Sequence, residues 1–249
     1  MNSPNVRITV LKNTLFLYVR FFITIIVSLY TSRIVLQALG VDEFGIYVIV
    51  NSIIGIFYFF QASFDQTAKR FLSFEIGKND SYRLKETFGS LLSIYGLLCL
   101  LLIICYNTFG LFFLNNYLNI DSNKIFSANI VFQVSILTSI ILLIKSPYLS
   151  AIIANEKMSI YAYISIIEVS FKLLLIYLLL NANTDKLILY SLLLAFTEIS
   201  IFFLIYFVCI KRFHETRFRF RWNKNIIKKI LRFSVWTFYG KFVLIFIHN

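Results

Sequence analysis

The chain has 249 residues, of which 59% are hydrophobic, 18% are aromatic and only 14% are charged, and its mean hydropathy is +0.80. A water-soluble domain needs many more charged positions at its surface, so this composition excludes an ordinary soluble protein and makes the bilayer the expected solvent. The net charge of +12 is compatible with nucleic acid, anionic lipid headgroups or an anionic substrate as the partner.

Apolar stretches recur along the chain, each close to the roughly 20 residues that cross a hydrocarbon core about 30 Å thick as a helix. They predict spans at approximately 12–36, 44–64, 87–114, 125–150, 159–181, 187–210 and 230–247. The first stretch is longer than the core of a secretory signal, so we interpret it as a span. The expected fold class is all-α, a polytopic transmembrane bundle of six spans followed by one more.

Lys and Arg residues are unevenly distributed between the predicted connections. The connections at 37–43, 115–124 and 181–186 contain only Lys124 and Lys186, whereas the N-terminal tail and the connections at 65–86, 151–158 and 211–229 contain many basic residues. Because Lys and Arg in short loops resist translocation, this pattern places the N-terminus in the cytoplasm. We therefore expect a multi-pass protein of the bacterial inner membrane.

The segment RFRFRWNKNIIKK at 217–229 alternates bases with aromatics, a pattern that can bind nucleic acid. Its position between two predicted spans favours anionic lipid instead, so membrane lipids are expected as partners and nucleic acid is not. The loops contain no Gly-rich phosphate loop, HExxH or GxSxG motif. We therefore expect no enzyme activity, no catalytic residues, no cofactor and no metal site.

Ionisable side chains inside membrane helices cost about 2.5–3.5 kcal/mol on insertion scales, so they usually face a cavity or a partner. The candidates for a substrate-binding cavity are Arg20, Lys172, Lys145, Asn51 and Tyr58. The candidates for charge balance or ion coupling are Glu168, Glu198 and Asp65. Together they predict a polar cavity with net positive character, which suits a phosphate-bearing substrate.

Structural alternatives exist for each of these candidates. Arg20 can extend its side chain to the membrane interface. Glu168 and Lys172, four residues apart with the acid first, can form a purely structural ion pair. Glu198 requires either a basic partner or proton exchange, and the small residues Gly55 and Ala62 can form a helix-packing groove.

Three segments give the chain a family resemblance: LYTSRIVLQALGVDEFGIYVIVNSIIG at 29–55, KRFLSFEIGK at 69–78 and ANEKMSIYAYISIIEVSFKLLL at 154–175. They resemble polysaccharide flippases, the O-antigen and capsule translocases of the multidrug/oligosaccharidyl-lipid/polysaccharide (MOP) exporter superfamily. In that family a Leu-Gly-x-x-x-[FY]-G-x-[YF] pattern joins the first two spans. Its positions are occupied here by Leu39, Gly40, Phe44, Gly45 and Tyr47.

The resemblance implies about twelve to fourteen helices in two pseudosymmetric halves around a central cavity. It also implies alternating access, with a polyprenyl-pyrophosphate-linked oligosaccharide as the substrate for lipopolysaccharide, capsule or exopolysaccharide biosynthesis. Other polysaccharide assembly proteins are further expected partners. The cavity residues would then hold the pyrophosphate or an acidic sugar.

Six spans and one more make only half of such a bundle. Residues 1–229 are predicted to be the amino-terminal six-helix repeat, and 230–249 the first helix of a truncated second repeat. A short match between two segments of the sequence supports the interpretation that a second repeat begins at residue 230. It pairs Lys12, Thr14, Leu15, Phe16 and Tyr18 with Arg232, Ser234, Val235, Trp236 and Phe238.

Three other functions remain open at this stage. One is a drug/cation antiporter of the same superfamily, whose cavity would need acidic and aromatic residues. Another is a membrane enzyme of lipid-linked sugar metabolism, such as a polymerase or glycosyltransferase, although the outer loops are short. The last is a non-transporting fragment or interaction subunit.

Overall fold

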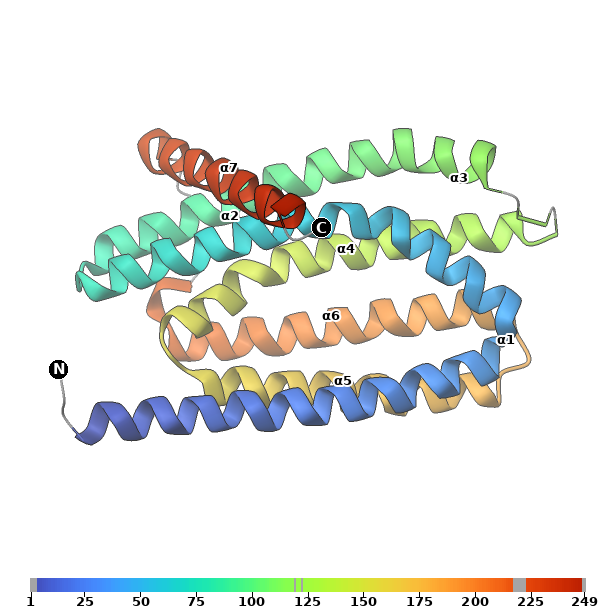
Figure 1. Cartoon of the computed structure of the whole chain (residues 1–249), viewed down its shortest axis with the longest axis horizontal. Helices are drawn as coiled ribbons and strands as arrows, with labels where there is room; N and C mark the ends of the chain where they lie inside the picture. Colours follow the sequence, from blue (N-terminus) through green and yellow to red (C-terminus); the bar gives the residue numbers. More distant parts are fainter. Residues whose placement is uncertain (1–3, 119, 122, 217–222, 248–249) are drawn as a thin grey trace.

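The structure, a computed structural model, describes residues 4–118, 120–121, 123–216 and 223–247. The described residues form long helices, most of which lie side by side in one bundle (Figure 1). This arrangement confirms the all-α fold class. The structure does not describe Arg217, Arg219, Arg221 or His248. The first half of the segment at 217–229, in which basic and aromatic residues alternate, therefore lies outside the described residues.

The first helix, α1 (Pro4–Gly77), contains a sharp break at Gly40, whose backbone angles are φ 78° and ψ 172°. Side chains with a Cβ atom are excluded from this region by steric clash, so glycine is required for the break. The chain reverses direction here and returns along the bundle (Figure 1). The first two predicted spans are therefore the two arms of one broken helix, and the predicted connection at 37–43 is mostly helical.

The remaining elements are α2 (Ser81–Cys105), η1 (Tyr106–Gly110), α3 (Leu111–Tyr117), α4 (Ile125–Ala154), α5 (Met158–Leu180), α6 (Lys186–Arg212), η2 (His214–Thr216) and α7 (Lys224–Ile247). Most of these helices follow the predicted spans and extend beyond them, whereas α5 is shifted by one residue and η2 lies in a predicted connection. The predicted loop at 65–86 is the largest discrepancy, because helix continues to Gly77 and resumes at Ser81. Intrahelical hydrogen bonds do not require hydrocarbon, so helices can continue into the headgroup region and water.

Five described segments are long and apolar enough to cross a membrane. The first is Asn13–Tyr58, whose 46 residues contain the break and are long enough for two crossings. The others are Ser81–Tyr117, Ile125–Ala154, Met158–Leu180 and Lys186–Arg212. This is the architecture of a multi-pass membrane protein. A helix also covers the predicted seventh span at 230–247, within α7.

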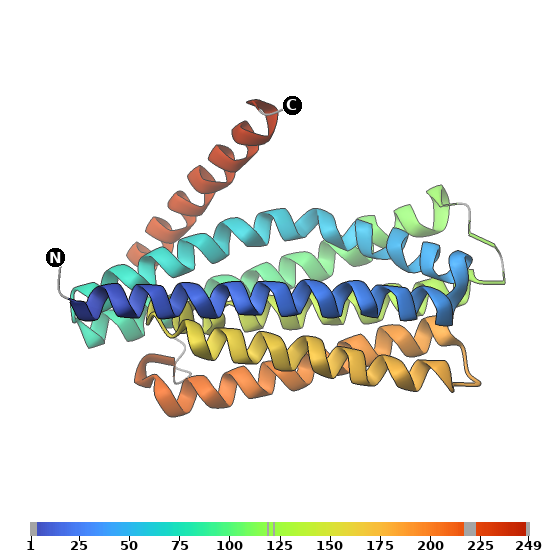
Figure 2. The same cartoon turned by 60° about the horizontal axis from the view of Figure 1, so that its bottom comes forward.

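Helix α4 lies at the centre of the bundle, in contact with α1, α2, α5 and α6. Its residues Ala128, Val131, Phe132 and Ile152 are completely buried. By contrast, α7 packs mainly against α1 and α2 and then projects away from the bundle (Figure 2). Ser234 of α7 donates a hydrogen bond of 3.1 Å to Thr67, and Phe238 stacks on Phe60 with ring centroids 4.6 Å apart.

Candidate functional site

Four charged side chains from three helices meet inside the bundle. The Nζ atom of Lys145 on α4 lies 2.6 Å from Oε2 of Glu198 on α6. Lys172 on α5 lies 3.1 Å from Oε1 of the same carboxylate. Glu168 on α5 approaches both lysines, at 3.7 Å from Lys145 and 3.9 Å from Lys172. We call these four residues the charge cluster.

The charge cluster has a buried side and an accessible side. The side chains of Lys145 and Glu198 are each 5% exposed, whereas those of Glu168 and Lys172 are 25% and 30% exposed. Burying two opposite charges requires close pairing, because desolvation costs several kcal/mol per ion. Lys145 and Glu198 satisfy that requirement, and Glu168 and Lys172 are the members that a ligand can reach.

The charge cluster can be compared with three expectations from the sequence. Its two lysines balance its two glutamates, so these residues alone do not give the cavity a net positive character. Of the two alternatives expected for Glu198, the structure shows the basic partner, because its carboxylate accepts hydrogen bonds from both lysines. The expected pair of Glu168 and Lys172 is present, but at 3.9 Å it is the longest contact of the four.

A polar pocket of about 240 Å³ lies beside the charge cluster. Lys172 forms part of its wall and connects the two features. The remaining lining residues come from α1, α5 and α6 and are Ser28, Thr31, Ser32, Tyr47, Val169, Ile176, Tyr190 and Leu194. Tyr47 and Tyr190 pack edge to face with centroids 4.7 Å apart. A ligand in this pocket would meet hydroxyl groups and the Lys172 ammonium.

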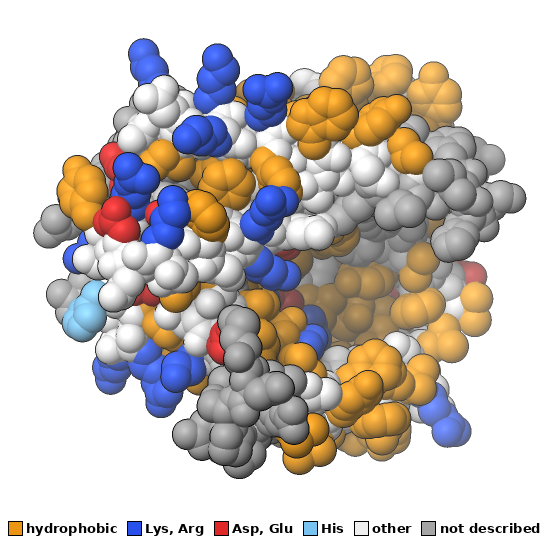
Figure 3. All heavy atoms as spheres, turned by 60° about the vertical axis from the view of Figure 1, so that its left-hand side comes forward, with side chains coloured by type: hydrophobic (Ala, Val, Ile, Leu, Met, Phe, Trp, Pro, Cys, Tyr) orange, Lys and Arg blue, Asp and Glu red, His pale blue; other side chains and the backbone are white. Residues whose placement is uncertain are grey.

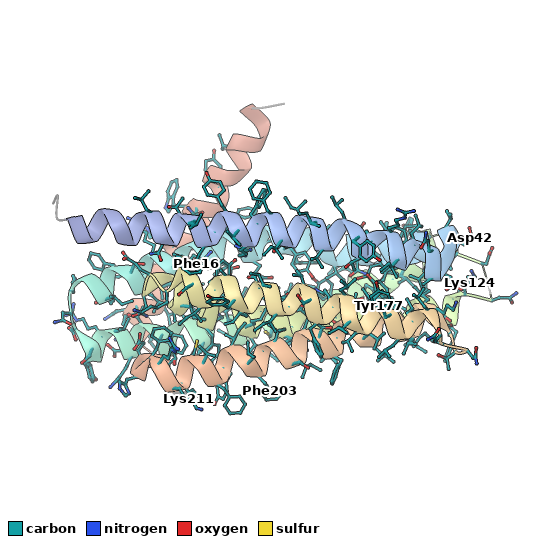
Figure 4. The ribbon with its side chains drawn as sticks, turned by 90° about the horizontal axis from the view of Figure 1, so that it is seen from below. Phe16, Asp42, Lys124, Tyr177, Phe203 and Lys211 are labelled. Carbon is teal, nitrogen blue, oxygen red and sulfur yellow. The ribbon has the colours of Figure 1, made fainter. Side chains whose placement is uncertain are left out.

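Arg20 lies apart from the charge cluster, on the side of α1 that faces α5. Its guanidinium carbon lies 4.3 Å from the ring centroid of Tyr161. The Nε atom of Arg20 and the hydroxyl of Thr24, one turn further along α1, are both buried, and neither has a hydrogen-bond partner within the described part of the chain. Such a group costs about 1–3 kcal/mol when it remains unsatisfied. Helices α1 and α5 run together along the molecule (Figure 4), and Ser28 of the polar pocket follows Thr24 after one more turn.

Asp65 belongs to a separate network. Its carboxylate accepts hydrogen bonds from the Tyr95 hydroxyl, at 2.7 Å, and from the Ser146 hydroxyl. This network joins α1, α2 and α4. Lys145 and Ser146 are consecutive in α4. Lys145 belongs to the charge cluster, and Ser146 belongs to the Asp65 network.

The two uncharged cavity candidates are not ion-pair members of the charge cluster, although Tyr58 lies within electrostatic range of Glu198. The Asn51 side chain donates to the carbonyl of Tyr47 in its own helix, at 3.0 Å. Tyr58 is 40% exposed. Sequence reasoning missed Tyr95, Ser146 and Tyr161, although a tyrosine within an apolar run is a usable signal because its hydroxyl needs a partner when buried.

The surface view shows a hollow in one face of the molecule, lined largely by hydrophobic side chains, with Lys or Arg and Asp or Glu side chains in it (Figure 3). Other Lys and Arg side chains gather on another part of the same face (Figure 3). Charged groups are therefore present both inside a recess and on the surrounding surface.

No protein-family model and no curated protein match this chain. Two solved structures do. One, described as "protein A", has a TM-score of 0.78 at 15% identity over 96% of this chain and 54% of its own. The other is a MOP superfamily transporter from Pyrococcus furiosus, with a TM-score of 0.72 at 12% identity over 93% of this chain and 52% of its own. The chain thus has the fold of about half of each protein.

Proposed function

We propose that this chain is half of a MOP superfamily transporter that translocates a polyprenyl-pyrophosphate-linked oligosaccharide across the bacterial inner membrane. One observation carries the proposal. Two lysines and two glutamates are paired inside a bundle that has the fold of about half a solved MOP transporter, and one of the lysines opens onto a polar pocket. The resemblance to polysaccharide flippases supports the oligosaccharide substrate.

Lys172 is the proposed contact for the pyrophosphate. It is more exposed than Lys145, it lines the polar pocket, and its ammonium binds Glu198 at 3.1 Å. A phosphate oxygen that enters the pocket would compete with that carboxylate for the ammonium group. Because Lys145 keeps the other oxygen of Glu198 at 2.6 Å, the carboxylate would remain paired after Lys172 is released.

Arg20 is the proposed second basic contact. Its Nε atom is buried and unsatisfied, so a phosphate oxygen beside it would supply the missing acceptor. Its stacking on Tyr161 leaves the edge of the guanidinium for hydrogen bonding. A substrate with two phosphates could contact Arg20 and Lys172 on the same side of the bundle, while its lipid tail remains in the bilayer.

Alternating access requires a partner for this half-bundle. We propose that a second set of helices faces the charge cluster and the polar pocket and that the two sets rock about the substrate. In this account the N-terminus is cytoplasmic, and Glu168 or Glu198 balances charge or couples transport to an ion gradient. The product would enter lipopolysaccharide, capsule or exopolysaccharide biosynthesis.

The test is transport by the protein, in its full encoded length, reconstituted in proteoliposomes. A polyprenyl-pyrophosphate oligosaccharide would be supplied in the membrane, and its appearance on the opposite face would be followed with an impermeant sugar-cleaving enzyme. We expect translocation above that of protein-free vesicles. Translocation no faster than in protein-free vesicles would refute the proposed substrate.

A drug/cation antiporter is the second candidate, because the charge cluster offers as many carboxylates as ammonium groups. In that case the same vesicles would export a cationic dye, and Glu198→Gln would abolish the export. Dye export without movement of the lipid-linked oligosaccharide would select this alternative.

A further inference from the structure

A second polar pocket, of about 220 Å³, lies at the end of the bundle where α1 ends and where α2 and α7 begin. Its lining residues are Phe71 and Glu75 of α1, Arg83, Glu86 and Thr87 of α2, and Asn223, Ile226 and Lys229 at the start of α7. It contains two acidic and two basic side chains. None of them belongs to the charge cluster.

Glu75 is the residue that indicates a missing ligand. Its Oε2 atom is buried and has no hydrogen-bond partner among the residues that the structure describes. The other carboxylate of the pocket is already engaged, because Glu86 accepts from the Asn223 side chain at 3.0 Å. Asn223 also caps α7 by accepting from the backbone N–H of Asn225 at 3.0 Å. An ammonium group in the pocket would provide Glu75 with both a donor and a countercharge.

The basic residues of the pocket are available to an anion. Arg83 is 61% exposed and forms an ion pair with Asp80, at 3.5 Å. Lys229 is exposed on the first turns of α7. The N-terminal end of the α7 dipole adds positive character, although Asn223 already caps the N–H groups of Asn225 and Ile226. A phosphate could therefore bind to Arg83 and Lys229 while an attached ammonium group binds to Glu75.

The pocket lies at the depth of lipid headgroups. Glu86 is the last charged residue of α2 before the apolar run that continues through α3 to Tyr117. We therefore place the hydrocarbon boundary on the apolar side of Glu86, and the headgroup region extends about 5–8 Å beyond that boundary. Phe71 and Ile226 give the pocket an apolar side, against which acyl chains can pack.

We propose that this pocket binds the headgroup of phosphatidylethanolamine, in which a phosphate and a primary ammonium group are joined by two carbons. The bound lipid would connect α7 to the bundle. A purely anionic headgroup would leave Glu75 unpaired and bring a second negative charge beside it. A choline headgroup carries a cation but has no N–H to donate. The recognised chemistry is the pair of phosphate and primary ammonium.

The experiment uses the purified protein exchanged into nanodiscs that contain equal amounts of phosphatidylethanolamine, phosphatidylglycerol and phosphatidylcholine. Native mass spectrometry after extraction then counts the retained lipids. We expect phosphatidylethanolamine to be retained about tenfold over either competitor, a difference that corresponds to about 1.4 kcal/mol. Equal retention, or preference for phosphatidylglycerol, would overturn the proposal.

Two variants separate selectivity from affinity. Glu75→Gln is expected to remove the preference for phosphatidylethanolamine, because it removes the countercharge for the ammonium. Arg83→Gln, at an exposed position, is expected to lower retention of all three lipids. Glu156→Gln is the matched control, since Glu156 is exposed in the connection between α4 and α5 at the same end of the bundle (Figure 1). Unchanged selectivity in Glu75→Gln would contradict the assignment.

Soluble O-phosphoethanolamine distinguishes the lipid from a free metabolite. If the lipid is the ligand, this compound should not raise the melting temperature of the delipidated protein, whereas added phosphatidylethanolamine should. The reverse result would reject the lipid as the ligand. None of these outcomes depends on transport, so the proposal can fail while the proposed function stands.

Discussion

Lys145 and Glu198 form the shortest ion pair in the described part of the chain, with 2.6 Å between Nζ and Oε2. They lie 53 residues apart in sequence, on α4 and α6, and each side chain is 5% exposed. Lys172 holds the other oxygen of the same carboxylate at 3.1 Å, so Glu198 bridges two lysines. This bridge connects a structural contact between helices to the group that opens onto the polar pocket.

Replacing Lys145 should destabilise the protein. In Lys145→Met, the carboxylates of Glu198 and Glu168 must share Lys172 as their basic partner. Removing one partner of a buried ion pair lowers the free energy of unfolding by about 3–5 kcal/mol. We expect a loss of about 3 kcal/mol in the free energy of unfolding, measured by reversible denaturation in mixed micelles.

The double variant Lys145→Met/Glu198→Gln should recover part of that stability, because Lys172 and Glu168 then remain as a neutral pair. Lys211→Met is the matched control: Lys211 is exposed at the end of α6 (Figure 4), and its loss should change stability by less than about 0.5 kcal/mol. If Lys145→Met and Lys211→Met were equally stable, the buried pair would not be a significant contact.

The Asp65 network should contribute a measurable amount to stability through one hydroxyl. Tyr95 is completely buried and donates to Asp65 at 2.7 Å, so Tyr95→Phe leaves the carboxylate with Ser146 alone. A hydrogen bond to a charged group is worth about 1.5–3 kcal/mol, and we expect a loss of that size. Tyr117→Phe, at an exposed tyrosine, should have almost no effect on the same unfolding measurement.

Gly40 should not tolerate a side chain although there is space for one. A Cβ atom at Gly40 would meet no atom within 4 Å, so any cost of Gly40→Ala comes from the backbone, at φ 78°. Conformations of this kind cost about 1–3 kcal/mol for residues other than glycine.

Gly55 provides the control, because it is also free of neighbours within 4 Å but lies in the uninterrupted second arm of α1. Gly55→Ala should be neutral or stabilise by up to about 1 kcal/mol, since alanine is the better helix former. A destabilising Gly55→Ala would instead favour the predicted helix-packing groove around Gly55 and Ala62. The two variants are compared by their midpoints of thermal unfolding.

The attachment of α7 should depend on Phe233. Its ring receives the guanidinium of Arg70 at 4.2 Å and packs edge to face with Phe71 at 6.0 Å. Phe233→Ala should therefore increase hydrogen exchange in α7 by about tenfold or more while leaving α4 and α6 unchanged. Trp236→Ala removes a larger ring that is 64% exposed and should leave exchange near the wild-type rate. Equal effects of the two variants would mean that Phe233 does not anchor the helix.

Sequence reasoning identified the helices well, because apolar runs of membrane length have no alternative structure in a bilayer. It placed a loop at 37–43 where a single residue, Gly40, makes the break. The Leu-Gly pattern correctly marked the turn. The pattern could not show that helix continues on both sides, since helix ends are set by local hydrogen bonding and not by hydropathy.

The site was predictable only where its contacts are local. Glu168 and Lys172 are one turn apart, so their pairing follows from the sequence. The bridge from Lys145 to Glu198 depends on the packing of α4 against α6, which no spacing in the sequence encodes. Arg20 and Asp65 were grouped with these residues by burial and charge alone. The structure instead places Arg20 over Tyr161 and Asp65 beside Tyr95.

The most direct test of the account is the initial rate of oligosaccharide translocation by Lys172→Gln in proteoliposomes, beside wild type, Lys172→Arg and Lys211→Gln. Folding of each variant is checked first by its midpoint of thermal unfolding. We predict that Lys172→Gln loses at least about tenfold in rate, equivalent to about 1.4 kcal/mol, while Lys172→Arg retains most activity and Lys211→Gln all of it. A folded Lys172→Gln protein that transports at the wild-type rate would contradict the claim that the charge cluster holds the substrate.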